Sequence, residues 1–137
     1  MDRKQIILQN DIQQVPLLAQ FVDEACETAG LNMATSMKLN LAIEEAVVNV
    51  MNYAYPQDTI GDINIEVQVD HNQLEFIISD SGTPFDPTTK AEVDTTLSAE
   101  ERTIGGLGIH LVRNIMDSIN YERVNGKNIL ALIKKLK

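Results

Sequence analysis

Residues 41–55 read LAIEEAVVNVMNYAY, and this stretch determines much of the fold. Its apolar residues recur at intervals of three and four, which places them on one face of an α-helix. The pattern extends back to Ala34 or Thr35, and Pro56 ends it because a proline disfavours helical geometry in the residue before it. The sequence therefore predicts a long amphipathic helix ending at Tyr55, with an apolar face made of Leu39, Ile43, Ala46, Val47, Val50 and Ala54.

The segments on either side follow helical or strand periodicity. Strict alternation of apolar and polar residues at 63–69 and 74–78 indicates two antiparallel strands with one wet face. Asn125-Gly126 is a type I′ turn signal between two later strands. In chain order, the sequence predicts a strand at 4–9, a helix at 15–29 capped by Gly30, the long helix, strands at 63–69 and 74–78, a helix at 107–119, and a hairpin of 121–124 with 128–136.

Strands that come as adjacent antiparallel pairs do not fit a doubly wound parallel sheet. We expect an α+β two-layer sandwich instead, with one mixed, mainly antiparallel sheet and three helices on one face. A chain of 137 residues has the commonest size of one domain, so we expect a single domain over residues 1–137.

Charge and composition exclude several classes of function. A formal net charge of −9 offers no basic field for nucleic acid or an anionic membrane surface, so we expect neither as a partner. The single cysteine, Cys26, excludes an internal disulfide and a cysteine-based zinc site, and its apolar helical setting predicts a core position. We see no signal peptide and no apolar run near the ~18 residues of a membrane span. We therefore expect a cytoplasmic protein.

Two polar residues stand out in the long helix. Glu45 and Asn49 lie one turn apart, so their side chains can reach the same point. A buried amide without a partner costs about 1–3 kcal/mol, so burial would imply a bound group that satisfies it. The alternative is that both side chains face solvent.

Asp80 is a second candidate, at the end of a strand. It keeps the core-facing phase of Phe76 and Ile78 and is followed by Ser81-Gly82. Its carboxylate is therefore placed at the mouth of a pocket, where it can accept a hydrogen bond from an exocyclic amine. The alternative is an ordinary Asp-x-Gly turn.

Residues 103–111, TIGGLGIHL, are a glycine-rich start to a helix. Backbone amides there can approach a phosphate closely, and the helix dipole favours an anion. No strand directly precedes them and no Gly-Lys-Ser/Thr is present, so they form neither a dinucleotide fingerprint nor a P-loop. Helix starts of this kind also occur without function. The preceding residues 81–104 lack periodicity and predict a lid or a disordered segment.

Together and in this order, the three motifs resemble those of the ATPase family shared by gyrase, Hsp90, histidine kinases and MutL. Residues 41–55 resemble its N box, residues 80–87 (DSGTPFDP) its G1 box, and residues 105–111 (GGLGIHL) its G2 box. Within that family the chain is most similar to the anti-sigma-factor serine/threonine kinases, which share the Glu-x-x-x-Asn and Pro-Phe-Asp-Pro patterns. Pro84 replaces the second G1 glycine of the wider family, a departure that this branch shares.

The resemblance implies a Bergerat-type fold that binds ATP or ADP with Mg²⁺. Asn49 would coordinate Mg²⁺ through its side-chain oxygen, Asp80 would bind the adenine amino group, and Gly82 would let the base approach. Glu45 matches the general base that accepts the proton of an attacking hydroxyl. The phosphates would be surrounded by the glycine-rich residues Gly105, Gly106, Leu107 and Gly108.

Other residues near these motifs receive lesser roles. Tyr53 and Asn52 share the stripe of Glu45 and Asn49, and we expect them to be pocket walls. Arg102 is a weaker candidate for neutralising phosphate charge, and we expect His110 to be structural. The ATP lid would span about residues 86–104, with its centre at 91–101.

For the function, the resemblance implies an ATP-dependent protein serine/threonine kinase in a partner-switching pathway. It would phosphorylate a STAS-type anti-anti-sigma protein, bind a sigma factor in exchange, and form a homodimer. One alternative is a nucleotide-binding module that sequesters partners without phosphotransfer, although the presence of Glu45 argues against it. Another is the detached catalytic domain of a histidine kinase, which the missing dimerisation helices disfavour.

Overall fold

The structure is a computed structural model that describes residues 2–56, 58–87 and 106–136. Among these residues, no helix combines the length and the apolar character needed to cross a membrane. The elements in chain order are β1 (Asp2–Gln9), the 3₁₀ turn η1 (Ile12–Gln14), α1 (Val15–Ala29), α2 (Met33–Tyr53), β2 (Asp62–Val69), β3 (Gln73–Asp80), α4 (Gly106–Ile115), β4 (Ser118–Val124) and β5 (Lys127–Lys135).

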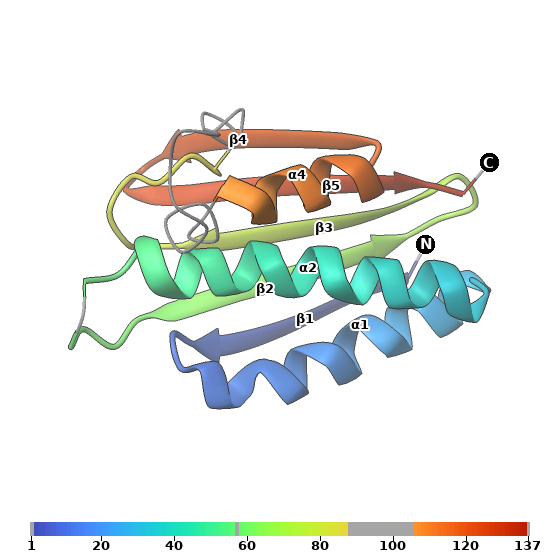
Figure 1. The fold of residues 1–137 in the computed structure, drawn as a ribbon, viewed down its shortest axis with the longest axis horizontal. Coiled ribbons are helices and arrows are strands. Elements are labelled where there is room, and N and C mark those ends of the chain that lie inside the picture. The colour runs from blue at the N-terminus through green and yellow to red at the C-terminus, as the bar shows by residue number, and fades with distance from the viewer. Residues whose placement is uncertain (1, 57, 88–105, 137) are drawn as a thin grey trace.

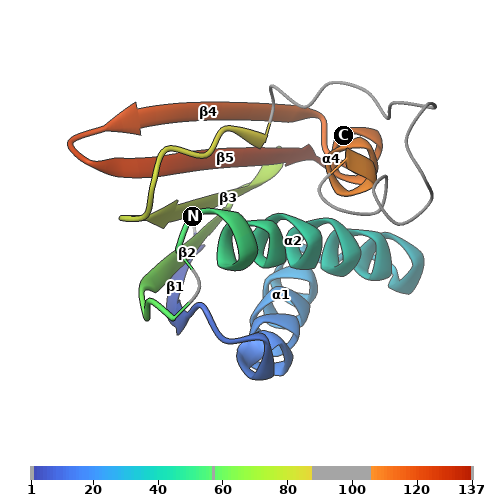
Figure 2. The ribbon, with the colours of Figure 1, turned by 60° about the vertical axis from the view of Figure 1, so that its left-hand side comes forward.

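The strands form one five-stranded sheet in the order β1-β2-β3-β5-β4. Every neighbouring pair is antiparallel. Figure 1 shows α1, α2 and α4 in front of this sheet, and Figure 2 shows from the side that all three cover the same face. The predicted α+β two-layer sandwich with three helices on one face is confirmed, and the sheet that was predicted as mixed but mainly antiparallel is antiparallel at every described pairing.

The core lies between the helices and the sheet. Residues of β2 and β3 alternate between buried and more exposed positions, as the period-two pattern predicted. Phe76, Ile78 and Leu132 are no more than 1% exposed, and Cys26 is also buried in α1, as expected. Full burial of a side chain of this size stabilises the fold by about 1.5–3 kcal/mol. Asp80 and Asn128 also occupy core-facing positions of their strands, so the packing of the core orients these polar side chains as well.

The bounds of α2 differ from the prediction at both ends. The helix begins at Met33 because the side chain of Asn32 caps it, accepting a hydrogen bond from Thr35 N at 2.8 Å. It ends at Tyr53, so the predicted end at Tyr55 is wrong by two residues. Beyond that point tertiary contacts turn the chain: the hydroxyl of Tyr55 donates to the backbone oxygen of Asp62 at 2.7 Å.

The helix predicted over 107–119 is too long at its C-terminal end. α4 ends at Ile115, and Ile119 lies in β4 opposite Leu132 of β5. Ile119 fits both patterns, because it comes four residues after Ile115, as on one face of a helix, and two residues before Tyr121, as on one face of a strand. Strand pairing with β5 wins over helical spacing, so β4 begins at Ser118 and not at the predicted residue 121.

Two turns predicted from glycine are confirmed. Gly30 ends α1 in the left-handed conformation with φ of 72°, and its N–H bonds the carbonyls of Cys26 and Glu27. Asn125 and Gly126 have φ of 51° and 78°, as a type I′ turn between β4 and β5 requires. This turn fixes the register of β4 on β5, in which Arg123 faces Asn128; on its other side, Asn128 faces Asp80 of β3.

Candidate functional site

Asp80 and Asn128 form a buried polar pair at one end of the sheet. They are direct cross-strand partners on β3 and β5, and their exposed fractions are 5% and 4%. Oδ1 of Asp80 accepts hydrogen bonds from Asn128 Nδ2 at 2.9 Å and from Gly82 N at 2.8 Å. The bond to Gly82 is that of an Asp-x-Gly turn, so the turn interpretation holds together with the buried, core-facing position. Oδ2 accepts no hydrogen bond from the described residues.

The side chain of Asn128 also holds the loop that follows β3. Its Nδ2 donates to the backbone oxygen of Thr83 at 2.8 Å, and its Oδ1 accepts from Phe85 N at 3.1 Å. The hydroxyl of Tyr121 on β4 donates to the same Oδ1 at 2.5 Å. One buried amide therefore joins two strands and the loop residues 83–85.

The same loop is attached to the C-terminal end of α2. The backbone oxygen of Ala54 accepts from Thr83 N at 2.6 Å and from Thr83 Oγ1 at 3.0 Å. A Cβ on Gly82 would lie 2.2 Å from that oxygen, so only glycine fits this contact. Arg123 donates through Nη1 to the backbone oxygen of Gly82 at 2.8 Å. The loop is thus fixed from α2 on one side and from β4 on the other.

Tyr55 ties the loop to the start of β2. Its hydroxyl accepts from Ser81 N at 3.0 Å while donating to Asp62. Burial raises the pKa of the Tyr55 phenol, and the carboxylates of Asp80 and Asp62 add to the rise, whereas the hydrogen bond from Ser81 opposes it. The phenol therefore stays protonated and keeps donating well above neutral pH.

Tyr53 lies on the last turn of α2, and its ring stacks on that of Phe85. The ring centroids are 5.5 Å apart and the planes are inclined by 30°. An offset stack of this kind contributes about 0.5–1.5 kcal/mol beyond area burial. The residue predicted as a pocket wall is therefore packed against the loop that Asn128 holds.

Glu45 and Asn49 lie on α2, one turn apart. Asn49 is 7% exposed, and Glu45 is half-buried. Within the described part of the chain, neither side chain has a hydrogen-bond or ion-pair partner. The solvent-facing alternative is therefore wrong for Asn49, whose amide is buried and has no partner in the described residues. Its oxygen fits the amide ligand that Mg²⁺ accepts, because a metal contact would satisfy it.

The glycine-rich motif is described only in part. Gly106 begins α4, and His110 is half-buried within that helix. Gly105, Arg102 and nearly all of the predicted lid at 86–104 lie outside the described residues, as does the side chain of Leu107, and the exposure of Gly108 is likewise not described. The predicted phosphate contacts therefore stay predictions.

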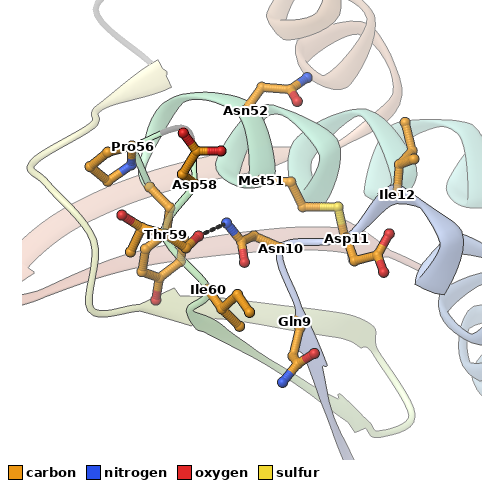
Figure 3. A pocket seen from close by; sticks show the side chains of 11 residues that line it. Gln9, Asn10, Asp11, Ile12, Met51, Asn52, Pro56, Asp58, Thr59 and Ile60 are labelled. Atoms are coloured by element: carbon orange, nitrogen blue, oxygen red, sulfur yellow. Dashed lines mark hydrogen bonds between the residues drawn. The ribbon is translucent and has the colours of Figure 1, made fainter.

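Asn52 is exposed and lines a cavity of about 850 Å³, which lies between the end of α2, the β1–η1 turn, Pro56 and residues 58–60. None of Glu45, Asn49 and Asp80 lines it. Figure 3 shows Asn10 reaching across this region to the backbone oxygen of Thr59, a hydrogen bond of 2.6 Å. Asn52 thus belongs to a different hollow from the one its place on the stripe suggested.

Sequence reasoning missed three residues of this region, namely Asn128, Tyr121 and Tyr55. A signal for Asn128 was present, because it shares the inward phase of Leu130 and Leu132 on β5. A polar residue on a core-facing phase needs a partner, and Asp80 is the same exception on β3. No comparable pattern pointed to the contacts of Tyr55.

Three curated relatives carry the name Serine-protein kinase RsbW. The protein from Listeria monocytogenes (serovar 1/2a) is 32% identical over 106 residues, which is 74% of this chain and 68% of the relative. The Bacillus subtilis protein is 29% identical over 102 residues, covering 72% and 63% of the two chains. The Staphylococcus aureus MW2 protein is 32% identical over 94 residues, covering 65% and 59%.

A solved structure supports the same fold. The RsbU and RsbW domains of Rv1364c from Mycobacterium tuberculosis superpose with a TM-score of 0.68 over 98% of this chain and 32% of that one, at 14% identity.

The sequence model of the histidine kinase-like ATPase domain matches residues 8–134, which include all three motifs. This chain therefore belongs to the histidine kinase-like ATPase domain family, whose domain implies ATP binding.

Proposed function

We propose that this protein is an ATP-dependent protein serine/threonine kinase that acts as an anti-sigma factor in a partner-switching pathway. The observation that carries the proposal is the buried amide of Asn49, which has no partner among the described residues and stands one turn from the carboxylate of Glu45. A metal ligand beside a general base is the arrangement that phosphoryl transfer requires. The names of the curated relatives add support.

In this proposal Asp80 accepts a hydrogen bond from the adenine amino group, and Gly82 leaves room for the base. Asn49 holds Mg²⁺, which when bound supplies positive charge to the phosphate oxygens. The phosphates themselves are surrounded by the glycine-rich residues Gly105, Gly106, Leu107 and Gly108.

The chemical step follows from the position of Glu45. Its carboxylate accepts the proton of a serine hydroxyl, and the serine oxygen bonds to the γ-phosphorus. The bond from that phosphorus to the β–γ bridging oxygen breaks, and ADP leaves with the bonding electrons. The products are ADP and a phosphoserine on the partner protein.

We assign the partner by resemblance to the anti-sigma-factor kinases. The substrate would be a STAS-type anti-anti-sigma protein, the exchanged partner a sigma factor, and the working form a cytoplasmic homodimer. The competing function is a nucleotide-binding module that sequesters partners without phosphotransfer. The half-buried Glu45 favours the kinase, because a module that only binds has no use for a base there.

The test is phosphotransfer by the full chain from γ-labelled ATP to each purified STAS-domain protein of the same organism. Glu45→Gln keeps the shape of the side chain but cannot accept the proton, so labelling should slow by about 10²–10⁴-fold. ATP affinity, measured by isothermal titration, should stay within about threefold of wild type, because Glu45 acts on the hydroxyl.

Glu44→Gln is the matched control, since Glu44 is the neighbouring carboxylate of α2 and is exposed. It should phosphorylate at the wild-type rate. Equal labelling by Glu45→Gln and wild type would refute Glu45 as the base. ATP binding with no labelled STAS protein would favour the sequestering module.

A further inference from the structure

The amide of Asn128 uses its whole hydrogen-bonding capacity inside the protein. Both Nδ2 hydrogens are donated, to Asp80 Oδ1 and to the backbone oxygen of Thr83. The amide oxygen accepts two further bonds, from Phe85 N and the hydroxyl of Tyr121. The partners fix the orientation, because a flipped amide would place its nitrogen against the N–H of Phe85.

This saturation determines how the carboxylate of Asp80 is presented. Oδ1 takes bonds from Asn128 and from Gly82 N, so it is committed to the protein. Oδ2 takes none from the described residues and remains an acceptor at the end of β3. Asp80 is 5% exposed, so the direction of its carboxylate is set by these two bonds and the surrounding packing.

We propose that Asn128 is a positioning residue that holds Oδ2 of Asp80 open as the acceptor and thereby sets the preference of the site for a base bearing an amino group. The inference rests on the proposed contact between Asp80 and adenine. Asn128 itself touches no ligand in this assignment. Its effect passes through Asp80 and through the loop residues 83–85 that it holds.

A base that lacks the amino group reports on this role. Hypoxanthine carries a carbonyl oxygen where adenine has its amino group, so it offers Oδ2 an acceptor and no donor. A site built to pair with a donor rejects such an analogue because buried polar groups then stay unpaired. Wild-type protein should bind ATP at least about tenfold more tightly than inosine triphosphate.

Asn128→Asp is the sharpest variant, because it keeps the side-chain shape and replaces the donor with a second carboxylate facing Asp80. The two acidic side chains compete where a donor stood before, Oδ2 is displaced, and the ATP-to-inosine-triphosphate affinity ratio should fall to within about threefold.

Two further variants keep the test independent of folding defects. Asn120→Asp makes the same substitution at an exposed asparagine of β4, and its affinity ratio should match wild type. Tyr121→Phe removes only the hydroxyl bond to Asn128 and adds no charge, so it should lower the ratio by about two- to fivefold.

Isothermal titration of the full chain with each nucleotide and Mg²⁺ gives these ratios. Selective loss of ATP affinity, with the inosine nucleotide little changed, supports the positioning role. Equal loss of both nucleotides, or an unchanged ratio in both Asn128→Asp and Tyr121→Phe, overturns it. A wild type that binds neither nucleotide refutes the proposed function itself, and one that binds both equally refutes only the inference.

Discussion

Two buried asparagines separate the candidate site into regions of opposite character. Asn128 is 4% exposed and makes four hydrogen bonds to Asp80, Thr83, Phe85 and Tyr121. Asn49 is 7% exposed, and within the described chain its amide makes none. Among the described residues, the same side chain is therefore fully satisfied at the end of the sheet and has no partner on α2.

This contrast distinguishes a residue that holds the structure together from a residue that is proposed to contact a ligand. A buried amide is stable only when its polar atoms are paired, so Asn128 stabilises the protein that contains it. With no partner among the described residues, the amide of Asn49 costs free energy, and the proposed metal would satisfy it. The region around Asp80 is therefore arranged before any ligand arrives, whereas in the proposed function the region around Asn49 would be completed by one.

The largest stability effect should come from Asn128→Ala. The substitution removes four hydrogen bonds at once and leaves the carboxylate of Asp80 without its side-chain donor. We expect the free energy of unfolding to fall by about 2–4 kcal/mol, measured by urea denaturation. Asn120→Ala, on the outer face of β4, should change it by less than about 0.5 kcal/mol. A similar small change for Asn128→Ala would remove the contrast.

A smaller loss should follow Gly82→Ala. The new Cβ would lie 2.2 Å from the backbone oxygen of Ala54, so the loop or the helix end must shift. We expect a destabilisation of about 1–3 kcal/mol by urea denaturation, together with weaker ATP binding. Ser81→Ala, the neighbouring exposed position, should retain wild-type stability. Wild-type stability of Gly82→Ala would show that the contact with Ala54 is loose.

Asn49→Ala should have the smallest effect on stability and a large one on ligand binding. Because the amide has no partner to lose in the described part of the chain, the free energy of unfolding without nucleotide should change by less than about 1 kcal/mol. The gain in ATP affinity on adding Mg²⁺, measured by isothermal titration, should disappear. Asn52→Ala, an exposed asparagine of the same helix, should keep that gain.

A destabilisation of Asn49→Ala as large as that of Asn128→Ala would mean that both asparagines are framework residues. Retention of the magnesium effect in Asn49→Ala would assign the metal ligand elsewhere. Either result would remove the separation of the site into two regions, and the second would also weaken the kinase proposal.

Local periodicity was sufficient to predict most of the fold. Alternation in β2 and β3 gave their buried faces, and Gly30 and Asn125-Gly126 gave the turns. The errors occurred where a tertiary contact decides the boundary. Tyr55 leaves α2 to bond Asp62, and Ile119 joins the sheet although helical spacing also fits it.

The site residues could be predicted wherever a polar residue occupies a position that the periodic pattern of its helix or strand assigns to the core. Asp80 and Asn49 stood out in this way, and both are buried. Asn128 carried the same signal on β5, but its importance depends on the register between β3 and β5, which the sequence does not encode locally. The sequence did not indicate the surroundings of Asn52, because a position on the helical stripe does not determine which cavity the side chain lines.

The hydrogen bonds from Thr83 to the backbone oxygen of Ala54 set the length of ligand that fits along α2. Ala54 follows Asn49 by five residues, a rise of roughly 7.5 Å along a helix. In the proposed assignment, the loop that contacts the base and the amide of Asn49 that contacts the metal are thus both attached to α2, so the distance between them is fixed. A nucleoside without phosphates, or a triphosphate without a base, would contact only one of these two regions.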